Sequence, residues 1–212
     1  MTMLETLRQD AEFAHRLRYP GRRPTLLSRA RIALGSRGMV VTAVHRLTWA
    51  ANARSQSGAV NGFTRRAMQA VAMVGRFVSA VVAKCQIAGA TVFEAGVYVS
   101  DGGHIILGAR RVGTGTVIHH GVTIGLHPID RGRPEIGRNV WIGPGALVYG
   151  NVHVGDGVTI LPGTVLSKSV PDRVVVQGNP ARIVRRDFDN APLLRSLRTD
   201  VAGFVEPGGQ VG

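Results

Sequence analysis

Aliphatic residues recur in six-residue steps between Ile106 and Pro171, with one step of twelve from Ile124 to Ile136. A small residue, usually glycine, tends to follow, and a second small or β-branched residue often comes four positions after the aliphatic one. The repeated anchors are Ile106, Val112, Ile118, Ile124, Ile136, Ile142, Val148, Val154, Ile160 and Leu166. This period is typical of a parallel β-helix, in which each hexad forms one short strand and one turn with its anchor pointing inward. Three hexads are expected to close one triangular coil, so that stacked residues lie about 4.8 Å apart.

The chain before the repeat has the apolar spacing of helices. Apolar residues three and four positions apart predict four helices, separated by Tyr19–Gly21, by Gly35 and by the polar linker Ser55–Gly62. The expected fold is therefore mainly β, with helices at the N-terminus. The expected parts are an N-terminal helical domain (1–86), a parallel β-helix (87–186) and a C-terminal tail (187–212).

Two places depart from the regular repeat. The segment Ser100–Ile105 adds one residue before Ile106. The segment Leu126–Glu135 preserves the frame but contains prolines, glycines and charged residues. Because its part His127–Arg133 has almost no inward aliphatic pattern, we expect it to project from one corner as a loop.

The formal net charge of +13 comes almost entirely from arginine. Such a charge attracts anionic partners, among them cofactor phosphates, acidic surfaces and nucleic acid. A general preference for arginine accounts for most of these positively charged residues. Because no nucleic-acid-binding motif accompanies them, we expect no nucleic acid as a partner.

Cysteine content and hydropathy restrict the class of protein further. Cys85 is the single cysteine, so no intramolecular disulfide is expected. The most apolar run, Ala67–Ala83, is broken by Arg76 and falls short of the roughly 18 apolar residues of a membrane span. A helix packed on its neighbours is favoured over a peripheral membrane contact. No export signal follows Met1, so we expect a cytoplasmic protein.

Three stretches resemble the hexapeptide-repeat acyltransferases, above all the serine acetyltransferases and sugar O-acetyltransferases: Gly121–Gly125, Gly132–Pro171 and Gly178–Val184. The resemblance is strong over 87–186 and weaker over 1–86. It implies a left-handed parallel β-helix assembled as a homotrimer or a multiple of three. The left hand is implied by the resemblance alone, because parallel crossovers are otherwise right-handed. It also implies transfer of an acetyl group from acetyl-CoA to a hydroxyl or amine of a small acceptor, with histidine as the base.

The family's catalytic positions are substituted in this chain. By alignment, Asp101 takes the place of the base histidine, Gln86 that of its orienting carboxylate, and Arg133 that of a second histidine in the loop. The repeat suggests a replacement, because Asp101 and His120 are each the third residue of hexads one coil apart. We expect them to stack, with the carboxylate orienting the imidazole as the base. The alternative is a column of exposed polar residues without a catalytic role.

Two further histidines are candidates for the base. His127 lies in the row Leu126–Asp130, which resembles the histidine-containing row of sugar O-acetyltransferases. His104 is close to Asp101 in a glycine-rich turn. His119 is expected to point away from His120, because neighbours on a strand face opposite sides.

Coenzyme A is expected to lie along a groove between neighbouring subunits. Close approach of its pantetheine arm is expected at small residues, and its phosphates are expected to meet cations. The candidates are Gly145, Ala146, Gly163 and Thr164 for the arm, and Lys168 and Arg182 for the phosphates. Each has an alternative role as a corner residue or a solvated cation. No metal site is expected, since no spaced ligand set occurs.

The preferred hypothesis is an acetyl-CoA-dependent O-acetyltransferase that resembles serine acetyltransferases. Two alternatives stay open: a catalytically inactive trimeric scaffold or partner-binding protein, and a sugar O-acetyltransferase. The substituted family positions favour the scaffold. The row Gly178–Arg182 and the clustered histidines favour activity.

Overall fold

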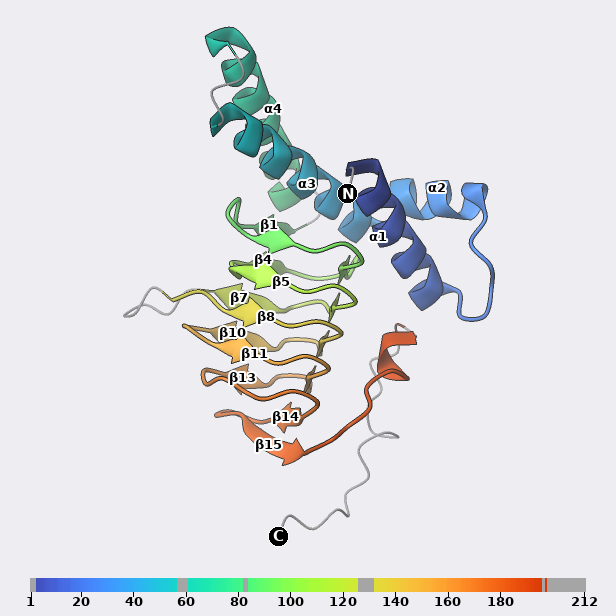
Figure 1. The fold of residues 1–212 in the computed structure, drawn as a ribbon, viewed down its shortest axis with the longest axis vertical. Helices are drawn as coiled ribbons and strands as arrows, with labels where there is room; N and C mark the ends of the chain where they lie inside the picture. The colour runs from blue at the N-terminus through green and yellow to red at the C-terminus, as the bar shows by residue number, and fades with distance from the viewer. Residues whose placement is uncertain (1–2, 57–60, 82–83, 126–131, 196, 198–212) are drawn as a thin grey trace.

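The computed structural model describes residues 3–56, 61–81, 84–125, 132–195 and 197. Helices come first and short strands follow, as the two sequence periods predict (Figure 1). The helices are α1 (Met3–Arg18), α2 (Leu26–Gly35), α3 (Arg37–Gln56) and α4 (Gly62–Val81). Their positions agree with the four helices expected from the apolar spacing.

The strands stack into three parallel sheets that form the sides of a prism. Sheet A contains β1 (Cys85–Ile87), β4 (Ile105–Leu107), β7 (Thr123–Gly125), β10 (Leu147–Tyr149) and β13 (Val165–Leu166). Sheet B contains β2 (Val92–Phe93), β5 (Arg111–Val112), β8 (Glu135–Ile136) and β11 (His153–Val154). Sheet C contains β3 (Tyr98–Val99), β6 (Val117–Ile118), β9 (Trp141–Ile142), β12 (Thr159–Ile160) and β14 (Val175–Gln177), with β15 (Arg182–Arg185) antiparallel at its end.

The hexapeptide anchors fill the inside of the prism, with one exception. Ile118 pairs with Ile142, and both are fully buried. The prediction of Ile106 as an anchor is wrong: it is 37% exposed, whereas Leu107 is fully buried and pairs with Ile124. The turn before β4 is longer than the sequence frame allowed, so the anchor moves on by one residue.

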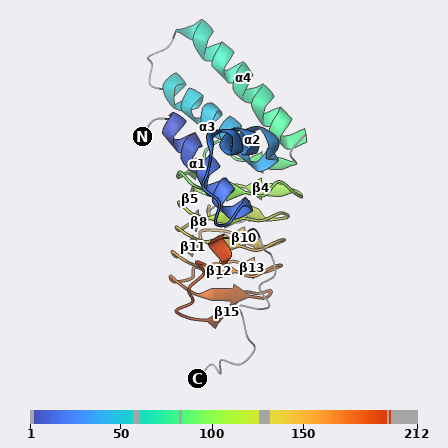
Figure 2. The same cartoon turned by 90° about the vertical axis from the view of Figure 1, so that its right-hand side faces the viewer.

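The outer face of sheet C is covered by the same chain. Trp141 on this face packs in one cluster with Leu17 of α1 and with Phe188 and Leu193. Leu193 begins the short 3₁₀ helix η1 (Leu193–Arg195). The segment that the sequence separates as a tail thus returns, in its described part, to the side of the prism (Figure 2).

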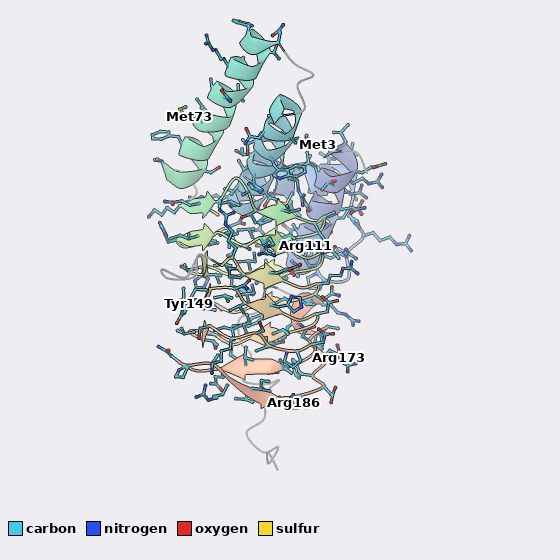
Figure 3. All side chains as sticks on the ribbon, turned by 60° about the vertical axis from the view of Figure 1, so that its left-hand side comes forward. Met3, Met73, Arg111, Tyr149, Arg173 and Arg186 are labelled. Atoms are coloured by element: carbon cyan, nitrogen blue, oxygen red, sulfur yellow. The ribbon has the colours of Figure 1, made fainter. Side chains whose placement is uncertain are left out.

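The outer faces of sheets A and B differ in charge. The outward column of sheet A is uncharged and consists of Gln86, Ile106, Thr123, Leu147 and Val165. The outward column of sheet B consists of Val92, Arg111, Glu135 and His153. Arg111 forms ion pairs with Glu94 and Glu135, on the face turned toward the viewer in Figure 3. Sheet A is therefore the uncharged side that α1 and η1 leave open.

A buried ion pair joins two helices to the first coil. Arg46 of α3 donates to both carboxylate oxygens of Asp10 in α1, at 2.7 and 3.0 Å. The same guanidinium donates to the carbonyl oxygens of Phe93 and Glu94, and Asp10 accepts the N–H of Gly96. These contacts orient α1 and α3 on the β-helix, because a planar guanidinium holds several acceptors in fixed directions.

Candidate active site

The corner where sheet C turns into sheet A brings His120 next to a column of glycines. Gly103, Gly121, Gly145 and Gly163 all have positive φ at this corner, between 68° and 75°. The Gly145 N–H donates to the carbonyl oxygen of His120 at 3.0 Å, and the Gly163 N–H donates to Pro144 one coil further along. The His120 side chain is exposed. The sequence-predicted base and two predicted coenzyme A positions therefore lie along one edge.

Gly145 and Gly163 leave open space along this edge. A Cβ built on either residue meets no atom within 4 Å, and positive φ disfavours any larger residue. In the part of the chain that the structure describes, no hydrogen bond reaches their carbonyl oxygens. An extended ligand with amide N–H groups finds two free acceptors there.

The other two predicted arm contacts are less accessible. The side chains of Ala146 and Thr164 are fully buried. Their N–H groups donate to Gly143 and Leu161, and their carbonyl oxygens accept from Thr123 and Leu147. Their N–H groups thus close the turn of their own coil, and their carbonyl oxygens join neighbouring coils.

Asp101 and His120 are on adjacent coils, but no hydrogen bond joins them among the described residues. Val99 pairs with Ile118, which is the register that the repeat predicted for these two coils. The Asp101 carboxylate instead faces the helices: it accepts from Arg18 Nη2 at 2.7 Å, from the Ser36 hydroxyl and from the Gly38 N–H. The structure therefore gives this carboxylate helix partners, and its role as the orienter of His120 stays a prediction.

The remaining histidines are in different environments. His104 is exposed in the turn before β4, near the start of the glycine column. His119 is buried, as its orientation opposite to His120 predicted, and its ring packs on Trp141 at 4.9 Å. Burial lowers the pKa of His119 to about 4, so it stays neutral near pH 7. His127 lies outside the described residues.

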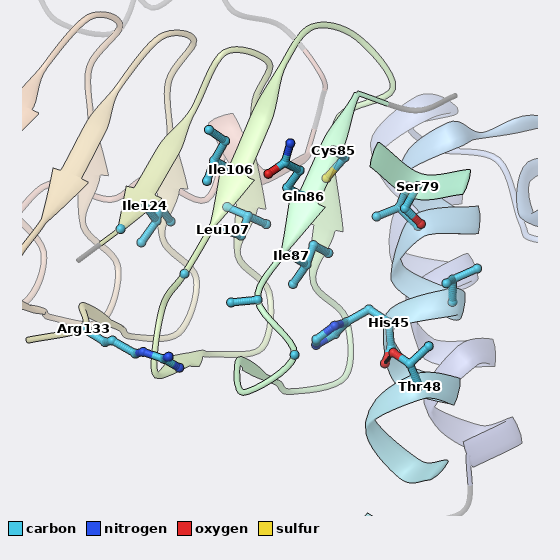
Figure 4. A pocket seen from close by; sticks show the side chains of 16 residues that line it. His45, Thr48, Ser79, Cys85, Gln86, Ile87, Ile106, Leu107, Ile124 and Arg133 are labelled. Atoms are coloured by element: carbon cyan, nitrogen blue, oxygen red, sulfur yellow. Dashed lines mark hydrogen bonds between the residues drawn. The ribbon is translucent and has the colours of Figure 1, made fainter. Parts of the chain in front are cut away.

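A cavity of about 580 Å³ opens between α3, α4 and the outer face of sheet A. Two of the three substituted family positions, Gln86 and Arg133, line it. His45 of α3 lies across the cavity from Arg133 (Figure 4). The His45 ring nitrogen Nε2 is 2.9 Å from the Thr91 carbonyl oxygen, and burial lowers its pKa. The sequence predicts His45 only as an ordinary helix residue, because helical spacing gives no sign of how α3 packs against the first coil.

The two predicted phosphate contacts lie at the last coils. Arg182 begins β15, opposite Gln177, and its guanidinium donates to the carbonyl oxygen of Ala181 at 3.1 Å. Lys168 follows β13 and is exposed. Neither forms an ion pair within the described residues, so both cations are available to an anionic ligand.

Comparisons with known proteins agree with the repeat and the fold. Residues 133–168 match the family described as Bacterial transferase hexapeptide (six repeats). Serine acetyltransferase 2 of Arabidopsis thaliana is 33% identical over 102 residues, which are 47% of this chain and 32% of the relative. Serine acetyltransferase of Staphylococcus xylosus is 37% identical over 93 residues, 42% of this chain and 43% of the relative. The chain thus spans less than half the length of these curated relatives.

Solved structures extend the similarity to most of the chain. Serine acetyltransferase of Brucella abortus strain S19, in complex with coenzyme A, has a TM-score of 0.68 at 25% identity, covering 86% of this chain and 68% of that one. The fold of the Neisseria gonorrhoeae serine acetyltransferase gives a TM-score of 0.71 at 21% identity, covering 88% of this chain and 68% of that one. These similarities confirm the predicted β-helix fold with its helical leader. The chain is a hexapeptide-repeat protein that is similar in sequence and fold to serine acetyltransferases.

Proposed function

We propose that this protein transfers an acetyl group from acetyl-CoA to a hydroxyl of a small acceptor. The observation that carries the proposal is the open edge formed by Gly145 and Gly163 beside the exposed His120. The coenzyme A complex of the similar Brucella abortus enzyme supports the choice of cosubstrate. Because acetyl-CoA is an intracellular metabolite, we place the reaction in the cytoplasm.

In the proposed complex, the pantetheine arm follows the glycine edge. Its amide N–H groups donate to the free carbonyl oxygens of Gly145 and Gly163, and its phosphates meet Arg182 and Lys168. Ala146 and Thr164 support the edge from inside the coil.

His120 takes the proton of the acceptor hydroxyl as its oxygen attacks the thioester carbonyl. The new C–O bond gives a tetrahedral intermediate. Its collapse breaks the C–S bond, and His120 returns the proton to the sulfur as coenzyme A leaves. His104 and His127 are the other candidates for this base.

The acceptor is proposed to enter the cavity beside sheet A. Gln86 supplies amide hydrogen bonds there, and the Arg133 guanidinium suits a carboxylate. A hydroxy amino acid, with a carboxylate next to its hydroxyl, fits this combination better than a neutral sugar. The printed titles of the similar enzymes, one of them in complex with serine, favour the same class.

We propose a homotrimer, or a multiple of it, in which the uncharged face of sheet A meets a neighbouring copy. The cavity of one copy then adjoins the histidine corner of the next. In this arrangement the base beside Gln86 and Arg133 is His120 of a neighbouring copy. His120 of the same copy is on another edge of the β-helix.

Release of free thiol from acetyl-CoA, measured across serine, homoserine, sugars and amino-sugars, tests the proposal. We expect thiol release with at least one hydroxyl acceptor, and loss of it in His120→Ala but not in His153→Ala, a matched exposed histidine on sheet B. Preference for a sugar would indicate the sugar O-acetyltransferase alternative. Absence of thiol release with every acceptor would contradict the proposed activity.

One observation favours the non-catalytic scaffold as a second candidate. The position that aligns with the family's base is occupied by Asp101, and its carboxylate binds the protein's own helices. Coenzyme A binding by calorimetry, without turnover on any acceptor, is the result expected of such a scaffold.

A further inference from the structure

The net positive charge of this chain is confined to one part of it. Of its 26 arginine and lysine residues, 13 lie between Phe13 and Phe93, a stretch that contains no aspartate or glutamate. The other 13 cations are balanced by the 13 acidic residues, all of them outside this stretch. Residues 13–93, which include most of the helical leader and the first two strands, therefore carry a charge of +13, and the rest of the chain is neutral in sum.

Many of these cations are accessible. Arg22, Arg23, Arg31, Arg37 and Arg66 are exposed and form no ion pair with another described residue. Arg18, Arg29 and Arg46 pair with acidic residues of the protein, whereas these five arginines present their charge to solvent.

The same part of the molecule exposes a helix of large apolar side chains. Among the described side chains of α4, the large apolar residues that are at least 59% exposed are Phe63, Val71, Met73, Val74, Phe77 and Val81. Among the described residues of the repeat, by contrast, the large apolar residues with the highest exposure are Val92 at 41% and Ile106 at 37%. Exposed apolar surface of this kind, gathered on one element, is a mark of an interaction site.

α4 has two different apolar faces. One packs on α3, where Gly75 lies against Val44 and Ser79 is buried. The other face is found by placing successive residues roughly 100° apart around the helix axis. It then spans an arc of about 160°, from Met73 through Val74 to Val71. Arg66 is exposed near the edge of this arc. Figures 1 and 2 show α3 and α4 extending past the first coil, and Figure 3 shows Met73 on the side of α4 away from α3.

We propose that this end of the protein docks on an anionic lipid membrane, with α4 lying in the interface. An amphipathic helix with aromatic and aliphatic residues on one face and arginines beside it binds membranes in this manner, and anionic headgroups add attraction for the surrounding cations. None of the helices among the described residues has the length and apolar character of a transmembrane segment. The proposed helix lies on the surface.

Charge and shape favour lipid over two other occupants, a second copy of this chain and a nucleic acid. A second copy placed on this face would bring two stretches of charge +13 together, and a strict coiled-coil seam is narrower than the observed arc. A nucleic acid would satisfy the arginines but would leave Phe63, Val74 and Phe77 without a partner. An anionic membrane attracts the cations through its headgroups and buries the apolar arc among its acyl chains.

The test is flotation of the full-length protein with unilamellar vesicles. We expect it to float with vesicles of equal phosphatidylglycerol and phosphatidylcholine, and to bind at least tenfold more weakly to phosphatidylcholine alone. Raising the salt should also weaken binding, since screening reduces the attraction to headgroups. Equal binding to both vesicle types, or binding to neither, would overturn the proposal.

Three variants separate the apolar contact from the charge. Val74→Asp combined with Phe77→Asp should lower vesicle affinity at least tenfold, and Arg66→Glu should lower it severalfold. Val92→Asp, an exposed apolar residue on sheet B, is the matched control and should bind as the parent does. Since these residues are exposed, circular dichroism and the thermal midpoint should stay unchanged.

Two other results would also count against membrane docking. Sedimentation velocity of Val74→Asp/Phe77→Asp should give the oligomer size of the parent, and a smaller oligomer would instead identify α4 as a contact between copies. If duplex DNA binds the parent and this variant equally and competes fully with vesicles, the surface is a polyanion site and the lipid proposal fails. None of these measurements depends on acetyl transfer.

Discussion

The carboxylate of Asp101 accepts a hydrogen bond from the hydroxyl of Ser36, the residue immediately before α3. The same oxygen accepts the N–H of Gly38, and the other oxygen pairs with Arg18 of α1. A carboxylate at the N-terminus of a helix satisfies N–H groups that have no partner within the helix, and it interacts favourably with the helix dipole. Asp101 therefore connects the first coil to two helices.

Asp101→Ala should lower the free energy of unfolding by about 3 kcal/mol, because hydrogen bonds to a charged group are lost and Ser36 loses its acceptor. Asp101→Asn keeps one carbonyl oxygen as an acceptor and should lose about half as much. Urea denaturation of the purified variants measures both values. Unchanged stability, together with a large loss of turnover in Asp101→Asn, would instead identify Asp101 as the orienter of the base.

The repeat could be predicted in detail because each coil is specified locally. Anchors such as Ile118 and Ile142 face inward wherever the step is six, and the structure confirms them. The one error, at Ile106, came from a turn, since the length of the loop over 100–104 does not follow from the periodicity of its neighbours. A shift of one residue in a strand exchanges the inner and outer faces, so Leu107 took the place of Ile106.

The candidate site could be predicted only along the corner. His120, Gly145 and Gly163 share the repeat, so their common edge follows from the spacing of the hexads. The partners of Asp101 come from α1 and the start of α3, more than sixty residues earlier, and no periodicity reports on how helices pack against a coil. The same limit hid His45 and the cavity beside Gln86.

Stability should fall in mild acid because of His119. Its pKa in the folded protein is about 4, below the ordinary 6.5, mainly through burial and secondarily through the charge of His120. The unfolded chain then binds more protons between these pH values, so stability is fully present above about pH 6.5 and declines toward pH 4. This one group accounts for up to about 3 kcal/mol.

His119→Leu should therefore flatten the pH dependence of the urea midpoint between pH 7 and pH 4.5. Its ring nitrogen Nε2 has no hydrogen-bond partner in the described structure, so the substitution breaks no hydrogen bond of that atom. His45, whose pKa burial also lowers, keeps a dependence of the same sign. The exposed His153→Leu serves as the control, and an equal flattening there would contradict the assignment.

Arg182→Ala should weaken coenzyme A binding about three- to tenfold without changing the thermal midpoint. The side chain is exposed and donates only to the neighbouring carbonyl of Ala181, so its loss removes a phosphate contact and little stability. Calorimetric titration with coenzyme A measures the effect. Arg138→Ala, an exposed cation at the corner between sheets B and C, should bind as the parent does, and equal affinity in both variants would reject the Arg182 contact.

Leu147→Asp should dissociate the proposed trimer. Leu147 belongs to the uncharged outer column of sheet A, and burying a carboxylate there against a second copy is costly. Sedimentation velocity at micromolar concentration should give a trimer, or a multiple of it, for the parent and a monomer for the variant. His153→Asp on the exposed face of sheet B should leave the oligomer intact. A monomeric parent would remove the shared site altogether.

His120→Ala should lower turnover by roughly 10²–10⁴-fold, the contribution of a positioned acid–base group, while coenzyme A affinity stays nearly unchanged. His104→Ala, at the same exposed corner, should have a small effect if His120 is the base. If His127→Ala abolishes turnover and His120→Ala does not, the base lies on the loop, and the chemistry is that of the sugar O-acetyltransferases it resembles there.

Combining Asp101→Asn with His120→Ala tests the predicted pair, because residues that act as a unit are non-additive. Lower turnover in Asp101→Asn alone, together with turnover in the double variant equal to that of His120→Ala, would support orientation by Asp101. A further drop matched by lost stability would assign Asp101 to the helices.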